Sequence, residues 1–157
     1  MERRSRRDCS GEYVLDTSYL LPLVGIEVEG LERDAYDKIL TMKLHFPIAL
    51  AAELAGVIAK EVRKLGIDEV PEGAVEGFNS IVFGGRINLV LPEGEDVKMA
   101  CDLIRTGWKD VFDALLYATA KRLGVRVLSM DREFKRFLRE KGYDADLLVS
   151  HKDIDEH

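Results

Sequence analysis

Apolar residues along this chain form short runs that suit buried strands, separated by longer segments with helical spacing. The strand-like runs cover residues 13–15, 45–48, 87–91, 125–129 and 146–149. The predicted helices cover residues 19–24, 32–43, 49–65, 71–82, 95–105, 110–123 and 132–141. Two of these helices end at a glycine, Gly66 and Gly124, as helices commonly do.

Strands that alternate with helices are typical of parallel βαβ units. We therefore predict a three-layer α/β/α sandwich with a central, mainly parallel sheet over residues 13–150. Residues 1–12 form a basic N-terminal extension in this prediction, and residues 151–157 form a polar C-terminal tail. Ligands of such sheets bind outside the carboxyl ends of the strands, so polar residues directly after a strand are candidates for a site.

A chain of 157 residues with 46% hydrophobic content is long enough for one domain with its own core. No apolar run approaches the roughly 18 residues of a membrane span, and the basic start lacks the apolar stretch of a signal peptide. We therefore expect a cytoplasmic protein with no membrane association. Cys9 and Cys101 have no metal or redox spacing and are expected to be free thiols.

The histidines do not combine with a serine or cysteine into a nucleophile system. We expect His45 in a turn or at the surface, and His151 and His157 in the tail. The net charge of −6 argues against general affinity for nucleic acid. A basic cluster nevertheless follows Asp131 closely, although solvated surface charge is its ordinary interpretation. The cluster consists of Arg132, Lys135, Arg136, Arg139 and Lys141.

Four carboxylates follow or interrupt apolar runs that hold no basic residue. Asp16 and Asp131 each follow a predicted strand, and Asp113 lies inside an apolar helix. Glu53 is the only charged residue from position 46 to position 59. An ionised carboxylate is rarely buried without a partner, because the loss of hydration is costly. If the four acids converge, a divalent cation is the expected partner.

Each acid also has a structural interpretation. Asp16 and Asp131 precede helices and could serve as N-caps, and Asp110 is expected to cap its own helix. Asp113 is harder to explain in this way because its neighbours are apolar. Glu53 lies about one turn into its helix, too late for a cap.

The four acids together favour metal chemistry. Like charges in one cleft repel, and without a cation some of the carboxyl groups would take up protons. Mg²⁺ and Mn²⁺ prefer hard oxygen ligands, and a bound ion can activate water and neutralise charge on a phosphodiester. Carboxylates without histidine or thiolate ligands suit phosphoryl transfer better than a zinc hydrolase.

Four segments carry a resemblance to a known family. Residues 14–21 read VLDTSYLL, 52–54 AEL, 113–120 DALLYATA and 127–134 VLSMDREF. In this order they resemble the four motifs of the PIN-domain family of metal-dependent ribonucleases. The last two motifs in tandem are the specific part, and the resemblance spans roughly residues 13–149.

The resemblance implies an endoribonuclease that activates water against an RNA phosphodiester. One or two Mg²⁺ or Mn²⁺ ions would be held by Asp16, Glu53, Asp113 and Asp131. Ser129 would orient a ligand or water, and Ser18 would do likewise, although both hydroxyls are equally well explained as caps or turn groups. Asp110 would add an outer contact.

Small bacterial and archaeal members of this family are in many cases VapC-type toxins, which an antitoxin inhibits and which are often homodimers. Other members process ribosomal RNA or bind RNA in larger assemblies. An RNA substrate, an antitoxin and a homodimer are therefore expectations from the resemblance. The basic N-terminal extension and the glycine-containing segment 73–94 depart from a minimal toxin and leave the biological role open.

Two enzyme-like alternatives fail on residue identity. A receiver domain needs an acidic pair after its first strand, where this chain has Asp16-Thr17-Ser18. A haloacid-dehalogenase-type phosphatase needs a second aspartate at the position of Ser18. A non-catalytic PIN-like module that binds RNA or protein is the main alternative, and the presence of all four acids argues against it.

Overall fold

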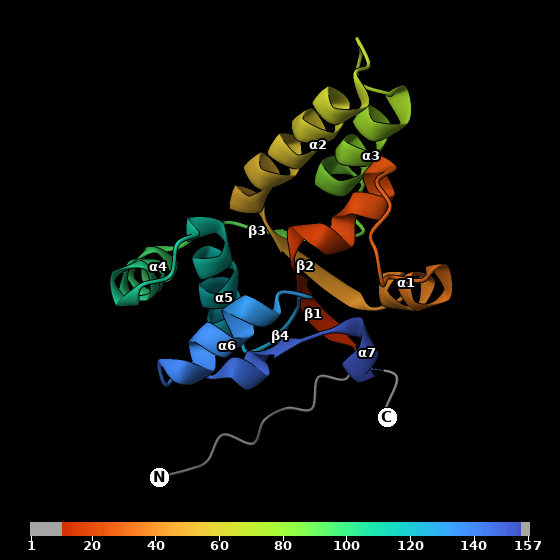
Figure 1. Cartoon of the computed structure of the whole chain (residues 1–157). Helices are drawn as coiled ribbons and strands as arrows, with labels where there is room; N and C mark the ends of the chain where they lie inside the picture. The colour runs from red at the N-terminus through yellow and green to blue at the C-terminus, as the bar shows by residue number, and fades with distance from the viewer. Residues whose placement is uncertain (1–10, 155–157) are drawn as a thin grey trace.

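The computed structural model describes residues 11–154, which form a three-layer α/β/α sandwich around a five-stranded sheet (Figure 1). All strand pairs in the sheet are parallel, and the strand order is β3-β2-β1-β4-β5. The strands are β1 (Glu12–Leu15), β2 (Lys43–Pro47), β3 (Asn88–Val90), β4 (Arg126–Leu128) and β5 (Leu148–Val149). The predicted fold class is confirmed.

The helices connect the strands in the predicted sequence, with small differences at their ends. The α-helices are α1 (Arg33–Leu40), α2 (Ala51–Leu65), α3 (Glu72–Phe83), α4 (Gly94–Thr106), α5 (Val111–Leu123), α6 (Arg132–Glu140) and α7 (His151–Ile154). Three short 3₁₀ segments complete the chain: η1 (Thr17–Val24), η2 (Ile48–Leu50) and η3 (Ala145–Leu147). Pro22 lies inside η1, where its missing N–H is compatible with a short 3₁₀ turn.

Strand β1 lies in the middle of the sheet and sets the position of the site. It pairs with β2 on one side and with β4 on the other, and Val14 and Leu15 are fully buried. The chain moves outward from β1 in both directions, so the topological switch point lies between β1 and β4. Ligands bind at the carboxyl ends of the strands at such a point. Asp16 follows β1 there, and Ser129 follows β4.

Helix α5 covers one side of the sheet. It contacts β1, β2 and β4, and α4 packs against its outer surface, whereas α1 lies on the other side of the sheet (Figure 1). The α4–α5 contact includes an ion pair in which the Arg122 Nε lies 2.9 Å from the Asp96 Oδ1. Asp96 is buried and also forms a capping box with Glu93 at the start of α4. The Asp96 carboxylate therefore has partners on both helices.

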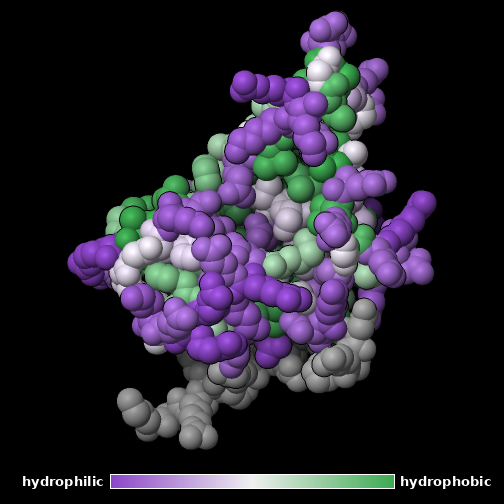
Figure 2. Space-filling view, in the orientation of Figure 1, coloured by the Kyte–Doolittle hydropathy of each residue, from purple (hydrophilic) through white to green (hydrophobic). Residues whose placement is uncertain are grey.

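Helices α2 and α3 form an arm that extends away from the sheet (Figure 1). Few of its residues are buried: Leu54 is the buried residue of α2, and Ala74 and Ile81 are those of α3. Apolar side chains are exposed on the arm, among them Leu65 at the end of α2 and Phe83 at the end of α3, and green residues show on the arm in Figure 2. None of the described helices is long and apolar enough to cross a membrane.

Two histidine predictions are wrong. His45 lies in β2 and is buried, because its ring nitrogens are both satisfied by Glu12 and Asn88 on the neighbouring strands. His151 is also buried, at the start of α7. The expected polar tail thus begins with a short helix up to Ile154, which packs against the core. Residues 1–10 and 155–157, including Cys9 and His157, lie outside the described residues, whereas Cys101 is an exposed free thiol.

The arm approaches η1 at a glycine. A Cβ atom on Gly77 of α3 would overlap with the backbone carbonyl oxygen of Leu23 in η1. The two backbones can therefore touch only because position 77 has no side chain. This contact supports η1, which carries Thr17 and Ser18 beside Asp16.

Replacing Gly77 by alanine is expected to lower the free energy of unfolding by about 1–3 kcal/mol, because the arm must shift away from η1. Gly73→Ala in the same helix is the matched control, since nothing lies within 4 Å of its added Cβ. That substitution should stabilise the protein by up to about 1 kcal/mol. Urea unfolding measures both values, and equal effects of the two substitutions would contradict the close contact.

Candidate active site at the carboxyl ends of β1 and β4

Asp16 and Ser129 are joined across the two central strands. The Asp16 N–H donates to the Leu128 carbonyl oxygen at 3.0 Å, and the Ser129 N–H donates to the Val149 carbonyl oxygen at 2.9 Å. These bonds extend the sheet ladder by one residue at β1 and at β4. The Ser129 hydroxyl then donates to the Asp16 Oδ2 at 2.9 Å. Ser129 therefore orients one carboxylate oxygen of Asp16.

Asp131 takes both of the roles considered for it, as a cap and as a neighbour of the other acids. Its Oδ1 accepts the Phe134 N–H at 2.9 Å and caps α6. Its own N–H donates to the Ser129 Oγ at 3.1 Å. Asp131 and Asp16 are thus held on the same hydroxyl group. By contrast, the Asp16 side chain makes no cap hydrogen bond to η1, so the cap interpretation of Asp16 is not supported.

Asp113 is oriented by a tryptophan. The Trp108 indole N–H donates to the Asp113 Oδ2 at 3.1 Å. Trp108 is buried and stacks on Phe134 with 4.7 Å between ring centroids, which fixes the indole against α6. Asp110 caps α5, as predicted, because its Oδ1 accepts the Phe112 N–H at 2.8 Å and the Asp113 N–H at 3.3 Å.

Glu53 lies in the first turn of α2 and is partly buried. It faces η1, where the Ser18 Oγ is buried and has no hydrogen-bond partner among the described residues, and where the Thr17 hydroxyl lies close enough to the Glu53 carboxylate to lower its pKa. Unpaired hydroxyl groups of this kind are uncommon in folded proteins, because each lost hydrogen bond has a free-energy cost. The Ser18 hydroxyl oxygen is therefore available as a ligand beside Asp16.

Burial raises the pKa of three of these acids. The pKa of Asp16 is raised to about 6 by burial and then by the charges of Glu53 and Asp131, while the Ser129 hydrogen bond opposes the shift. The pKa of Asp113 is raised to about 7 by burial and then by the charges of Asp110, Asp16 and Asp131, against the Trp108 bond. Burial followed by the charge of Asp110 also raises the pKa of Glu53.

These effects place each of the four predicted acids and Asp110 within electrostatic range of at least one other acid of the group. None of the five makes an ion pair with a lysine, arginine or histidine within residues 11–154. Among the described residues, Lys60 is the cation that lowers the pKa of Glu53, and its contribution is the smallest of those that act on this group. The cluster is therefore rich in negative charge and poor in positive charge.

The chemistry of the cluster fits a hard divalent cation, since all of its donors are carboxylate or hydroxyl oxygens. The spacing is wider than in a closed metal cage: within residues 11–154, no three His, Cys, Asp or Glu side chains are close enough together to hold an ion as they lie. Uncompensated carboxylates repel one another, so a bound cation would be expected to draw them inward.

Two residues beside the acids were not predicted. Trp108 lies between two predicted helices, is the only tryptophan of the chain and comes two residues before Asp110. Thr17 is the residue between Asp16 and Ser18, and its hydroxyl lowers the pKa of Glu53. The position of Thr17 beside Asp16, two residues after the end of a predicted strand, is the signal that could have identified it as a site residue.

The protein is thus an all-parallel α/β sandwich. Acids that have no ion-pair partner among the described residues lie at the topological switch point of its sheet. The PIN domain family matches residues 13–139, and the chain belongs to that family. No curated protein matches the chain. The family match covers the elements from β1 to α6 and so includes every acid of the cluster.

The raised pKa values predict how stability depends on pH without a metal ion. Between about pH 4 and pH 7 the folded protein binds more protons at Asp16 and Asp113 than the unfolded chain, so the free energy of unfolding falls as the pH rises. The loss is on the order of 3–4 kcal/mol for each carboxyl group, at about 1.4 kcal/mol for each pKa unit.

Thermal unfolding in EDTA from pH 5 to pH 8 measures this effect. The melting temperature of Asp113→Asn, relative to wild type, should improve as the pH rises, because the asparagine cannot ionise. Asp68→Asn, at an exposed position between α2 and α3, should follow wild type. Parallel curves for wild type and Asp113→Asn would refute the raised pKa of Asp113.

Proposed function

We propose that this protein is a metal-dependent endoribonuclease that hydrolyses RNA phosphodiester bonds with Mg²⁺ or Mn²⁺. PIN domains are generally nucleases, which is the starting point of the proposal. The observation that carries it for this chain is the cluster of carboxylates at the β1–β4 switch point, which has no ion-pair partner among the described residues. A divalent cation at this place would compensate the charge that the protein itself leaves uncompensated.

The roles of the residues follow from their positions. Asp16, Glu53, Asp113 and Asp131 would hold one or two ions, with Ser129 and Trp108 fixing the orientation of Asp16 and Asp113 through their hydrogen bonds. The bound ion would supply an activated water and neutralise charge on the phosphodiester. The unpaired hydroxyl of Ser18 would hold a water or an ion ligand. Asp110 would act through the backbone of Asp113.

The biological setting of the reaction rests on the family resemblance and, for its location, on the pattern of apolar residues in the sequence. A toxin role with an antitoxin partner, a homodimer and a cytoplasmic location all stay predictions. The protein offers exposed apolar residues on α2–α3 and α4 that a protein partner could cover, among them Leu65, Phe83, Val97 and Ile104. A toxin would require that such a partner also suppress cleavage.

A non-catalytic RNA- or protein-binding module is the second candidate. The spacing of the acids favours it, because no three of them lie close enough to hold an ion as they stand. The two candidates differ in what happens when one acid is removed. A binding module would keep its RNA affinity and would never cleave, whereas the enzyme would lose cleavage.

Purified protein is expected to cut RNA in Mn²⁺ or Mg²⁺ and not in EDTA, when tested on a single-stranded RNA and on a structured RNA. Asp16→Asn and Asp113→Asn should each lower the cleavage rate on the order of 100-fold or more, since each removes a charge that holds the ion. Asp68→Asn is the control for a loss of charge elsewhere and should cut like wild type.

Unchanged cleavage by Asp113→Asn would place the reaction at another site or in a contaminant. Binding of RNA without any metal-dependent cutting by wild type would favour the non-catalytic module.

A further inference from the structure

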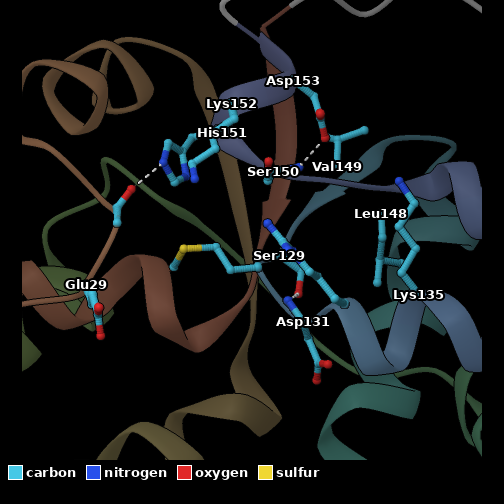
Figure 3. Close-up of a pocket in the computed structure, with 13 residues that line it drawn as sticks. Glu29, Ser129, Asp131, Lys135, Leu148, Val149, Ser150, His151, Lys152 and Asp153 are labelled. Carbon is cyan, nitrogen blue, oxygen red and sulfur yellow. Dashed lines mark hydrogen bonds between the residues drawn. The ribbon is translucent and has the colours of Figure 1, made fainter.

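A pocket of about 440 Å³ adjoins the acid cluster at the carboxyl ends of β4 and β5. Its walls come from the β4–α6 connection, from α6, from the β5–α7 connection with α7, and from the loop at Glu29 and Gly30 (Figure 3). A volume of this size falls within the range of small-molecule sites. The pocket is therefore large enough for one nucleotide.

The pocket and the acids share two residues. Ser129 and Asp131 line the pocket, and the same Ser129 hydroxyl binds Asp16. Figure 3 shows the Asp131 carboxylate pointing away from Ser150 and His151 on the opposite wall. The pocket thus lies beside the carboxylates and not among them, so a chain that occupied it would pass directly over the proposed site of cleavage.

Three cations line the pocket, and within residues 11–154 none of them has an ion-pair partner: Arg132 and Lys135 on α6, and Lys152 on α7. Two acids besides Asp131 also line it. The Asp153 Oδ2 is occupied, because it accepts the Ser150 N–H at 2.8 Å, and Glu29 is exposed on the opposite loop.

Arg136 and Arg139 continue the positive charge along α6, away from the pocket. Together with the pocket cations they offer a path of positive charge to a phosphate backbone.

The other part of the lining is apolar and rigid. Leu148 is buried, and Val149 and Met130 are partly buried. The ring of His151 is fixed at both nitrogens: its Nε2 donates to the Gly30 carbonyl oxygen at 2.8 Å, and its Nδ1 lies 3.0 Å from the Tyr19 hydroxyl. The His151 backbone N–H donates to the same hydroxyl, which leaves that hydroxyl's proton for the ring.

We propose that this pocket holds one unpaired nucleotide of the RNA next to the scissile bond. Lys135, Lys152 and Arg132 contact its phosphates, and its base lies against the apolar wall of Leu148, Val149 and Met130. The inference rests on the proposed function for its substrate and extends it to a defined subsite. A base inside a duplex cannot enter such a pocket without unpairing, so the subsite selects single-stranded RNA or loops.

Binding measured in EDTA tests the subsite without cleavage. The probe is a short fluorescein-labelled oligouridylate, and the readout is fluorescence anisotropy over a range of salt concentrations. The double variant Lys135→Ala/Lys152→Ala should bind about tenfold more weakly, and the slope of log K against log salt should become shallower by about 0.7 for each lost phosphate contact. Lys135→Arg should restore the slope, because it keeps the charge.

Lys98→Ala is the matched control. Lys98 is an exposed lysine on α4, which lies on the other side of the molecule from α7 (Figure 1), and its removal should leave affinity and slope unchanged. If the double variant does not fold, Lys152→Ala alone carries the test, since Lys152 is exposed. An RNA duplex of the same length should bind more weakly than the single strand and should respond less to the pocket substitutions.

The subsite is wrong if the pocket variants bind the single strand with the affinity and slope of Lys98→Ala. It is also wrong if the duplex binds as tightly as the single strand and depends equally on both lysines. The binding test is independent of the cleavage test. Lysine-dependent binding of the single strand supports the subsite even where wild type does not cleave. Metal-dependent cleavage together with unaffected binding by the pocket variants overturns the subsite alone.

Discussion

The fold of this protein gathers negative charge that it does not compensate. Asp16, Glu53, Asp113 and Asp131 lie in partly buried positions, Asp16 is within electrostatic range of the other three, and none of the four pairs with a cation among the described residues. Such an arrangement lowers stability at neutral pH, since burial and repulsion both oppose ionisation. The uncompensated carboxylates are explained best by a bound partner that supplies positive charge. This is the physical basis of the proposed metal-dependent chemistry.

The rest of the site supports this cluster through bonds that start at the sheet. Strands β1 and β4 each extend by one residue into the loop, which places Asp16 and Ser129 side by side. Trp108 orients Asp113 through a hydrogen bond from its indole N–H, and its ring stacks on Phe134 at the start of α6. Because every acid is tied to an element of the sandwich, its position depends on long-range packing and not on a flexible loop.

Much of the fold and the identity of the acids could be predicted from the sequence, for a definite reason. Glu53 and Asp113 are charged residues inside apolar helices, and this conflict is visible without a structure. The Asp16–Ser129 bond could not be predicted in the same way, because residues 113 positions apart meet only once β1 is known to pair with β4. His151 was misjudged for a similar reason: its partners Tyr19 and Gly30 are 132 and 121 positions away.

Titration of Mn²⁺ into EDTA-stripped protein, followed by calorimetry at pH 8 and pH 6, tests the central claim most directly. The account predicts binding at pH 8 that weakens at pH 6, because protons on Asp16 and Asp113 then compete with the ion. Asp113→Asn should bind at least about tenfold more weakly than wild type at pH 8. An absence of binding at pH 8, or equal binding by wild type and Asp113→Asn, would contradict the account.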